Sequence, residues 1–428
     1  MIIQFSVENF RSIKDEQTLS LVKNSATEMP DNYFSSDALS APELLKTAVI
    51  YGANASGKSN VLKALRCMQN IVANSNDSKP GALLPLNPFA FDVKMAKEPT
   101  NFELILVVEL PNKEGEKKPV KVIYGFSCDR KMVYEEWLSV YPKSREQAWF
   151  HRMYDDESGS YKWNTSSFFK GNKSYWQEST RENQLFLSVA THLNSTQLLP
   201  IYQAMTAKMP IIISNRIGSD FTKDVCRNDD NKRKLLVEFL RQAGIDVFDI
   251  DFRQRHADEL NIPEDFPDEL RQMVVERFLE DAAVFFIYKD SLGRPIEFEL
   301  EQESDGTQKL FEFAMLLMDV MEKGNTIIID ELNNSLHPKL VQHLVRLFNS
   351  KNNSGNGQLI FTSHETSVLR QDLLRRDQIW FCEKNSDRDT VLYPLTDFSP
   401  RKGREDVEEA YLHGRYGATP IIEEFYNL

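Results

Sequence analysis

One octapeptide constrains this chain more than any other feature. Residues Gly52 to Ser59 read Gly-Ala-Asn-Ala-Ser-Gly-Lys-Ser and fit the phosphate-loop pattern, in which Gly-Lys-Ser/Thr follows a glycine and four variable residues. The apolar run Leu45–Tyr51 precedes this loop, and Val61–Met68 follows it with helical spacing. Glycines let backbone N–H groups surround a phosphate, and Lys58 can reach the β- and γ-phosphates. The sequence therefore predicts a strand–loop–helix site for ATP, with Ser59 as a ligand of Mg²⁺. A chance match in a surface turn does not explain the flanking strand and helix patterns.

A second pattern places two carboxylates at the end of a buried strand. The run Thr326–Ile329 is apolar and is followed directly by Asp330 and Glu331. Such a run indicates a parallel strand that carries acidic groups to its C-terminal edge. We expect Asp330 to hold Mg²⁺ through water, and Glu331 to orient and polarise the attacking water. The pattern gains weight because a phosphate loop precedes it in the same chain.

A histidine follows the next predicted strand. Leu359–Thr362 reads as that strand, so His364 falls at its C-terminal end, at the same sheet edge as Glu331. An imidazole there can hydrogen-bond a γ-phosphate. A histidine that only satisfies a structural hydrogen bond is the alternative, but the position favours the catalytic interpretation.

The stretch Glu303–Gln308 precedes the apolar helical run Leu310–Leu317. We expect Ser304 to cap that helix, and Gly306 to let a phosphate approach it. Taken alone, the pattern favours an ordinary N-capped helix over a phosphate site. Its position shortly before Asp330 favours the phosphate interpretation.

The remainder of the chain contains four segments with a recognisable pattern. Residues 1–14 alternate as a strand with one buried face, and residues 89–141 read as a meander of antiparallel strands. From about 178 to 282 the periodicity is helical, and residues 283–302 return to a strand pattern. A sustained heptad array is missing, which argues against a long coiled-coil arm.

Composition and charge narrow the functional class. The net charge of −13 argues against a protein that coats DNA with a wholly basic surface. The four cysteines are far apart and read as reduced thiols of a cytoplasmic protein. The N-terminus does not resemble a secretory signal, and no run has the roughly 20 apolar residues that a membrane span needs.

The four patterns, in this order, resemble the core of ATP-binding-cassette (ABC) ATPases, and more narrowly the branch that includes the SMC, RecF and OLD-family proteins. Ser304 and Gly306 match the LSGGQ-like signature of that class, whereas Asp305 and Thr307 depart from it, and Asn333 stands where many relatives have Asp. The nearest likeness is to ATPases of bacterial abortive-infection phage defence, such as those encoded beside RloB-like or other TOPRIM nucleases, as in the PARIS system. The stretches that carry this likeness are Val7–Ile13, Tyr51–Asn60, Tyr124–Phe126, Glu136–Leu138 and Tyr411–Pro420.

The resemblance implies an α/β fold: an ABC-type ATPase head, with a mixed sheet, a phosphate loop and an antiparallel β subdomain, interrupted by a mainly helical lobe. The expected boundaries are 1–150 and 286–428 for the head and 151–285 for the lobe. It also implies catalytic roles for Glu331 and His364, and Mg²⁺ ligation by Ser59 and Asp330. The residues implied to contact the nucleotide are Arg11, Asn54, Ala55, Ser56, Gly57, Lys58, Ser59, Asn60, Ser304 and Gly306.

The class implies a homodimer, or a higher homo-oligomer, in which the signature of one subunit completes the ATP site of another. The likeness to defence ATPases further implies a TOPRIM-type nuclease as a separate chain encoded nearby, and no membrane association. An alternative of a different class is an SMC- or RecF-like DNA-repair clamp, which predicts salt-sensitive DNA binding. A third is a P-loop kinase, which would need an acceptor pocket and no signature.

Overall fold

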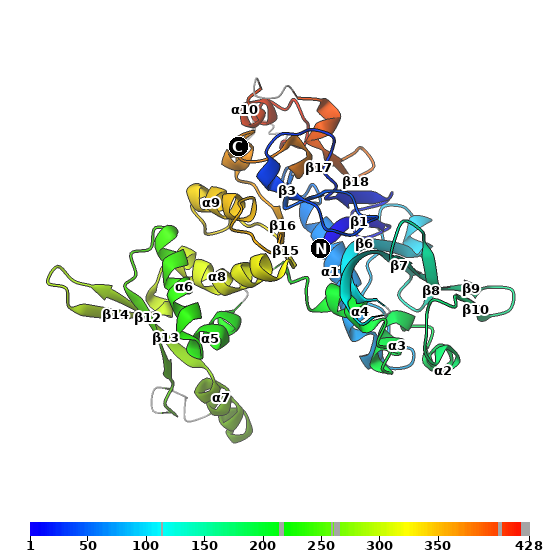
Figure 1. Cartoon of the computed structure of the whole chain (residues 1–428), viewed down its shortest axis with the longest axis horizontal. Coiled ribbons are helices and arrows are strands. Elements are labelled where there is room, and N and C mark those ends of the chain that lie inside the picture. The colour runs from blue at the N-terminus through cyan, green and yellow to red at the C-terminus, as the bar shows by residue number, and fades with distance from the viewer. Residues whose placement is uncertain (113, 214–217, 258–259, 261–265, 401–404, 421–428) are drawn as a thin grey trace, which may run out of the picture. The chain divides into compact units, whose positions relative to one another are not determined.

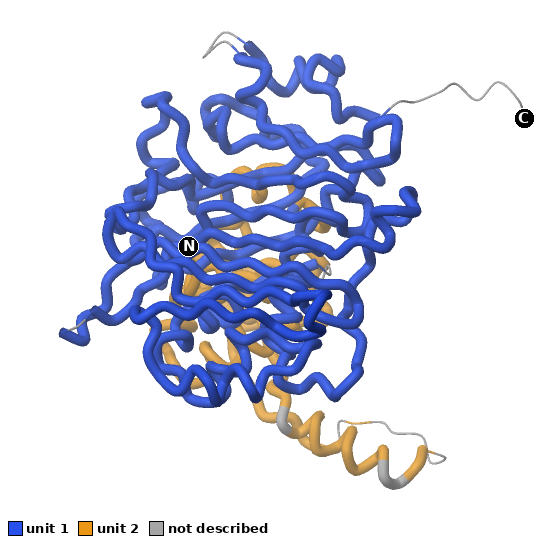
Figure 2. Tube along the Cα trace, turned by 90° about the vertical axis from the view of Figure 1, so that its right-hand side faces the viewer, with its two compact units in different colours: residues 1–213, 321–332, 344–428 blue, residues 214–320, 333–343 orange. Residues whose placement is uncertain are grey.

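The computed structural model describes residues 1–112, 114–213, 218–257, 260, 266–400 and 405–420. The chain divides into two compact units (Figure 2). Unit 1 comprises Met1–Ile213, Met321–Leu332 and Leu344–Leu428, and unit 2 comprises Ser214–Val320 and Asn333–His343. Two of the four boundaries fall within helices, namely α8 (Asp305–Lys323) and α9 (Pro338–Phe348).

A six-stranded sheet in unit 1 carries the phosphate loop. Its strand order is β11-β15-β16-β5-β17-β18, and only the last pair is antiparallel. The strands are β11 (Ile211–Ile212), β15 (Thr326–Ile329), β16 (Gln358–Thr362), β5 (Thr47–Tyr51), β17 (Ile379–Lys384) and β18 (Thr390–Pro394). Every residue of β5, β15 and β16 is buried, as expected of parallel strands covered on both faces. The predicted strands before the loop, before Asp330 and before His364 are therefore neighbours in one sheet.

A seven-stranded antiparallel sheet forms the other layer of strands in unit 1 (Figure 1). Its order is β10-β9-β8-β7-β6-β1-β2, so the first strand of the chain pairs with the predicted meander. The strands are β1 (Ile2–Glu8), β2 (Gln17–Ser20), β6 (Thr100–Pro111), β7 (Lys117–Cys128), β8 (Val133–Tyr141), β9 (Gln147–Asp155) and β10 (Ser160–Thr165). A two-stranded sheet, β3 (Tyr33–Phe34) with β4 (Leu44–Leu45), completes the strands of unit 1 in the described residues.

Unit 2 begins later in the chain than the expected lobe of 151–285, because several helices of that segment belong to unit 1. They are α1 (Lys58–Asn74), α2 (Lys173–Ser179), α3 (Phe186–His192), α4 (Leu199–Thr206) and α10 (Val407–Leu412). The segment 151–213 begins with strand residues of β9 and β10. Its helices bury Phe186, Leu187 and Ile201 in the same apolar core as α1 and the antiparallel sheet. This burial keeps residues up to Ile213 in unit 1, and the second unit begins at Ser214.

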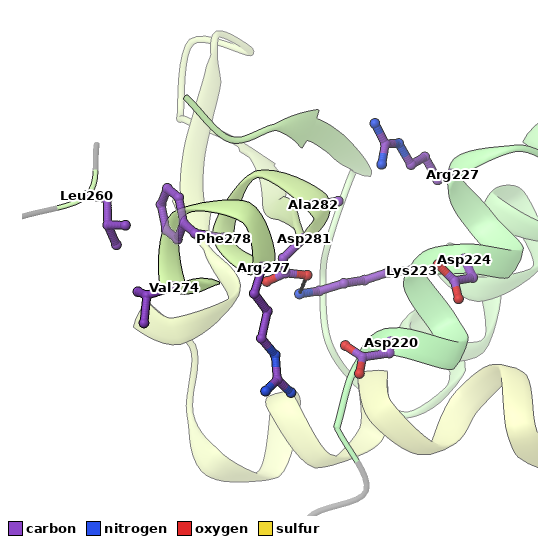
Figure 3. A pocket seen from close by; sticks show the side chains of 10 residues that line it. All are labelled: Asp220, Lys223, Asp224, Arg227, Leu260, Val274, Arg277, Phe278, Asp281 and Ala282. Atoms are coloured by element: carbon purple, nitrogen blue, oxygen red, sulfur yellow. Dashed lines mark hydrogen bonds and ion pairs between the residues drawn. The ribbon is translucent and has the colours of Figure 1, made fainter. Parts of the chain in front are cut away.

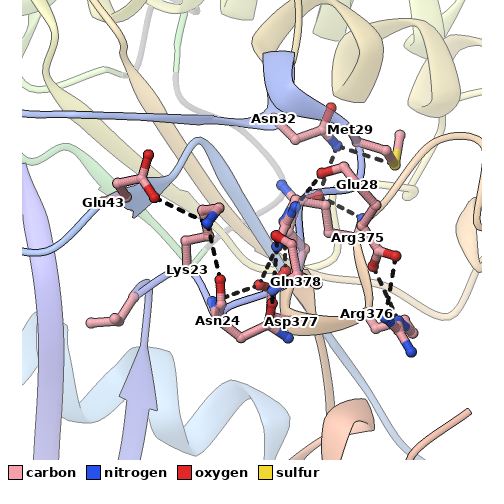
Figure 4. Close-up of polar contacts among 12 residues, drawn as sticks. Lys23, Asn24, Glu28, Met29, Asn32, Glu43, Arg375, Arg376, Asp377 and Gln378 are labelled. Atoms are coloured by element: carbon pink, nitrogen blue, oxygen red, sulfur yellow. Dashed lines mark hydrogen bonds and ion pairs between the residues drawn. The ribbon is translucent and has the colours of Figure 1, made fainter.

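A buried arginine fixes the segment after β2 in unit 1. Arg375 is 1% exposed, forms an ion pair with Asp377 at 2.8 Å, and donates to backbone carbonyls of Ala26 and Glu28 (Figure 4). The amide of Asn32 donates to Gln378 Oε1 at 2.8 Å in the same cluster. Because every donor of this buried guanidinium needs a partner, the cluster fixes one path for the chain between β2 and β3.

Unit 2 combines a three-stranded antiparallel sheet with helices. The sheet has the order β12-β13-β14, with β12 (Asp249–Gln254), β13 (Ala282–Lys289) and β14 (Pro295–Glu299). The helices are α5 (Asp220–Arg227), α6 (Asp230–Gln242), α7 (Asp268–Glu280) and the first parts of α8 and α9. The ring of Phe311 on α8 lies 5.9 Å from Phe286 and 6.4 Å from Phe252, so α8 packs on this sheet.

Among the described residues, no helix has the length and apolar character needed to cross a bilayer.

Candidate nucleotide site

The phosphate loop joins β5 to α1 through a strained backbone. Gly52 follows β5 directly, and Gly57 adopts a φ of +115° directly before Lys58 begins α1. At a positive φ of this size a side chain is disfavoured, so the glycine is required. The first amide groups of α1 have no helical carbonyl to bond and point toward the loop, where a phosphate can accept them. The hydroxyl of Ser56 is buried and has no hydrogen-bond partner in the described structure, so the loop holds an unsatisfied polar group.

The side chain of Lys58 is folded into this loop. Its ammonium donates to the carbonyls of Gly52 at 2.8 Å and Ala53 at 3.0 Å, and the residue is 5% exposed. Burial lowers the pKa of Lys58, while Cys382, Asp330 and Glu331 act in the opposite direction. These influences place the predicted lysine and the two predicted carboxylates in one electrostatic environment.

Residues far away in the sequence brace the loop. The Thr390 hydroxyl donates to the Ser56 carbonyl at 3.1 Å and shares a hydrogen bond of 2.7 Å with the Ser12 hydroxyl. Asn60 donates from its side chain to Ser12 Oγ at 2.7 Å. A Cβ built on Gly57 would lie 2.1 Å from Thr390 Oγ1, so the brace also requires glycine at this position. Sequence reasoning missed Ser12 and Thr390, because no local pattern marks either hydroxyl.

The two predicted carboxylates are organised by one buried threonine. Asp330 and Glu331 follow β15, and Thr362 ends the neighbouring strand β16. The Thr362 hydroxyl donates to Asp330 Oδ1 at 2.6 Å and accepts the backbone N–H of Glu331 at 2.7 Å. Glu331 has a φ of +51°, in the left-handed region that non-glycine residues rarely adopt. The hydrogen bond to its N–H supports that conformation and turns the chain sharply after Asp330.

His364 lies two residues beyond β16, and its ring is exposed. Its pKa is lowered from the usual 6.5, first by burial of part of the ring and then by Lys58, while Glu331 and Asp330 raise it. The charges that act on His364 are therefore those of the loop lysine and of the two carboxylates. The structure brings Lys58, Asp330, Glu331 and His364 to one edge of the sheet.

The oxygen atoms at this edge suit Mg²⁺. The described residues contain no cluster of three or more His, Cys, Asp or Glu side chains arranged to hold a metal ion. The predicted ligands are the hydroxyl of Ser59, at the start of α1, and the carboxylate of Asp330. Mg²⁺ in nucleotide sites takes one or two protein oxygens, and water and phosphate oxygens complete its octahedron. A hydroxyl and a carboxylate therefore fit this ion without a larger cluster.

The other predicted contact residues of unit 1 differ in their environment. Asn54 and Ala55 are exposed at the tip of the loop, where Ala55 has a φ of +63°. Arg11 is exposed, its N–H donates to the Asn87 carbonyl at 2.7 Å, and its guanidinium lies 5.6 Å from the Phe10 ring. The neighbouring Ser12, rather than Arg11, makes the contact with Asn60 of α1.

The predicted signature lies in unit 2. The Thr307 N–H donates to Ser304 Oγ at 3.2 Å, which is the capping bond expected at the start of α8. A Cβ on Gly306 would lie 2.8 Å from the Ser335 carbonyl, so glycine permits close packing of the helix start on residues 333–336. Lys309 donates to the Asn334 carbonyl at 2.5 Å and fixes the same contact.

Unit 2 also has a cavity of about 620 Å³ between α5 and α7 (Figure 3). Lys223 and Asp281 form an ion pair of 2.7 Å in its wall, beside apolar side chains of Val274 and Phe278. None of the predicted site residues lines this cavity, and neither Ser304 nor Gly306 at the start of α8 is among its lining residues.

Comparisons with known proteins bear on this site. A protein family described as "AAA domain, putative AbiEii toxin, Type IV TA system" matches residues 48–370, which include the phosphate loop, Asp330, Glu331 and His364. A comparison with curated proteins gives no match.

Three solved structures share low similarity with the chain. An SMC head bound to the C-winged helix domain of ScpA is 12% identical with a TM-score of 0.44, covering 93% of this chain and 99% of that one. An SMC head domain from Thermotoga maritima is 12% identical at a TM-score of 0.39, covering 92% and 98%. A third is an Smc head with an extended coiled coil, bound to the C-terminal domain of ScpA, from Pyrococcus furiosus. It is 14% identical at a TM-score of 0.38, covering 97% and 98%. Similarity at this level supports no statement about what this chain does.

The family match covers residues 48–370 of the 428 in the chain, which is more than half of its length. The match contains the phosphate loop and the acidic strand end that the geometry brings together. The chain therefore belongs to this AAA family and is an ATPase of that general type.

Proposed function

We propose that this protein hydrolyses ATP at the edge formed by β5, β15 and β16, and that it uses ATP-dependent dimerisation to control a nuclease effector in anti-phage defence. The observation that carries the hydrolytic part is the Thr362 hydroxyl, which bonds both Asp330 and the backbone of Glu331. This contact fixes one carboxylate for the metal and sets the direction of the other.

The residues then divide the work. Lys58 and the first N–H groups of α1 bind the phosphates, and Ser59 and Asp330 hold Mg²⁺. When held there, Mg²⁺ would supply positive charge that offsets the charge of the β- and γ-phosphates. Glu331 accepts a proton from the attacking water and orients it, while His364 hydrogen-bonds the γ-phosphate. The lowered pKa of His364 keeps its imidazole neutral near pH 7, so that one ring nitrogen donates and the other accepts.

Glu331→Gln tests the catalytic assignment. The amide keeps the size of the side chain but cannot take a proton, so turnover should fall about 100-fold or more while ATP still binds. Phosphate release and binding of a fluorescent ATP analogue measure the two effects separately. Turnover near the wild-type rate would remove Glu331 from the mechanism.

Ser304 is proposed to act on the ATP of a second copy of the chain. In support, Ser304 stands at the start of α8, where the first N–H groups of a helix have no helical carbonyl to bond and suit a γ-phosphate. Binding to ATP but not ADP in this way would couple dimer closure to the nucleotide. Ser304→Arg should therefore abolish turnover in the pure variant.

Mixing two inactive variants separates a shared site from a local defect. A dimer of one Ser304→Arg subunit and one Glu331→Gln subunit has one site with both Glu331 and Ser304 intact. Some turnover should return on mixing, and mixing two Glu331→Gln preparations is the control. If the mixture stays inactive although heterodimers form by mass spectrometry, the shared site is refuted.

The proposed role in defence is supported by the family, whose description names a putative AbiEii toxin and a Type IV TA system. The effector is proposed to be a TOPRIM-type nuclease encoded beside this protein. Co-purification with the adjacent gene product, with ATP and without, tests the partnership. Phage plating on cells that carry both genes, with Lys58→Ala as the control, tests the defence role. ATPase activity that rises with DNA and falls with salt, without a protein partner, would instead indicate a DNA clamp.

A further inference from the structure

The segment 405–420 near the end of the chain has no role in the site as described, yet it contacts the turn that follows His364. Helix α10 lies within this segment, and the turn contains the short 3₁₀-helix η6 (Thr366–Val368). The Thr366 hydroxyl donates to Glu408 Oε1 of α10 at 2.7 Å. The side chain of Glu365 caps η6 by accepting the Ser367 N–H at 3.0 Å. The turn is thus a short, hydrogen-bonded unit held from outside by one carboxylate.

A second contact holds the same turn from the phosphate-loop side. Tyr51 is the last residue of β5, directly before Gly52, and it is 1% exposed. Its hydroxyl donates to the Glu365 carbonyl at 2.7 Å. The residue next to His364 is therefore tied to the residue that precedes the loop.

Aromatic rings connect these two anchors. The Tyr51 ring lies 5.9 Å from the ring of Tyr411, which stacks on Phe381 of β17 at 5.4 Å and 15°. Tyr416 stacks on the same Phe381 at 5.5 Å and 23°. The Tyr411 hydroxyl donates to the Ala418 carbonyl at 3.1 Å, which closes the segment on itself. Buried aromatic contacts of this kind hold a segment in one position.

We propose that Glu408 and Tyr411 are positioning residues for ATP hydrolysis, which act by fixing the turn that carries His364. The inference rests on the proposed role of His364. It assigns the segment 405–420 to the ATPase machinery: without its contacts, the His364 ring samples positions that do not reach the γ-phosphate. Misplacement of a catalytic group by about 1 Å can lower a rate about 100-fold.

The primary test removes the carboxylate anchor. Glu408→Ala should lower kcat about 10- to 100-fold with KM for ATP within about twofold of wild type, because Lys58 and the loop are untouched. Thr366→Val removes the same hydrogen bond from the other side, keeps the volume, and should give the same kcat. Glu408→Gln retains an acceptor oxygen and should restore most of the rate. Glu409→Ala is the matched control, since Glu409 is exposed on the same helix.

Combination with His364→Ala identifies the route of the effect. If Glu408 acts through His364, the double variant Glu408→Ala/His364→Ala should have the same kcat as His364→Ala alone. An unchanged kcat in Glu408→Ala alone overturns the inference, and so does an equal loss of kcat in both backgrounds. A parallel loss of ATP affinity in Glu408→Ala, not restored by Glu408→Gln, also overturns it. His364→Ala with wild-type turnover would instead refute the proposed role of His364 itself.

Discussion

Substitution of Thr362 measures how much its hydroxyl stabilises the positions of Asp330 and Glu331 at the end of β15. Thr362 is fully buried, and its hydroxyl serves Asp330 and the Glu331 N–H at 2.6 and 2.7 Å. Thr362→Val keeps the shape and removes both hydrogen bonds. A hydrogen bond to a charged group contributes about 1.5–3 kcal/mol, and a buried N–H left without a partner costs about 1–3 kcal/mol. Because the two bonds share one hydroxyl, we expect a combined loss of about 2–4 kcal/mol in the free energy of unfolding of unit 1.

Tryptophan fluorescence during urea unfolding isolates this unit. The five tryptophans all belong to unit 1, at positions 137, 149, 163, 176 and 380. Thr362→Ser is the matched control, because it keeps the hydroxyl and loses only a methyl group, at about 1 kcal/mol. The more apolar valine should therefore be the less stable variant, and its turnover should fall because the Glu331 backbone is released. A valine variant within about 0.5 kcal/mol of wild type, or more stable than the serine variant, would refute this reasoning.

Three further outcomes are expected. Lys58→Ala should abolish ATP binding in a fluorescence titration, and an unchanged affinity would contradict its phosphate role. Gly57→Ala should weaken ATP binding at least about tenfold through backbone strain and the clash with Thr390, whereas Gly81→Ala, at a φ of +73° in open space, should bind ATP as wild type does. The lowered pKa of His364 means that the folded state binds its proton less readily than the unfolded state, so unit 1 should lose stability as pH falls through 6.5. From pH 7.5 to 5.5, the urea midpoint of His364→Gln should decrease less than that of the wild type. Equal decreases in the two proteins would contradict the lowered pKa of His364.

The parts of the site that the sequence predicts are those encoded by local pattern. A buried parallel strand reads as a continuous apolar run, so the strands ending at Tyr51, Ile329 and Thr362 could be located, together with the groups that follow them. Parallel strands place their C-terminal ends at a common edge, which brings Asp330 and His364 together without any knowledge of the whole fold.

The braces of the site could not be predicted in this way. Thr390 contacts the loop because β18 pairs with β17 beside β5, and Ser12 reaches Thr390 from the segment between β1 and β2. No short-range signal encodes either position. Thr362 was visible within the Phe-Thr-Ser-His stretch, but its role depends on the register between β15 and β16. The start of unit 2 differs from the expected start of the lobe for a related reason. Helical periodicity in 178–206 indicates which face of each helix is apolar, but it does not indicate against which core that face packs.

The position of β5 between β16 and β17 has a consequence for synthesis of the protein. Strand β5 leaves the ribosome long before its two neighbours in the sheet, which begin at Gln358 and Ile379. At about 5–20 residues per second, the ribosome needs on the order of tens of seconds to supply them. Throughout that interval the nascent chain has a phosphate loop sequence without its sheet, so nucleotide cannot assist the folding of the chain until β16 and β17 have been synthesised.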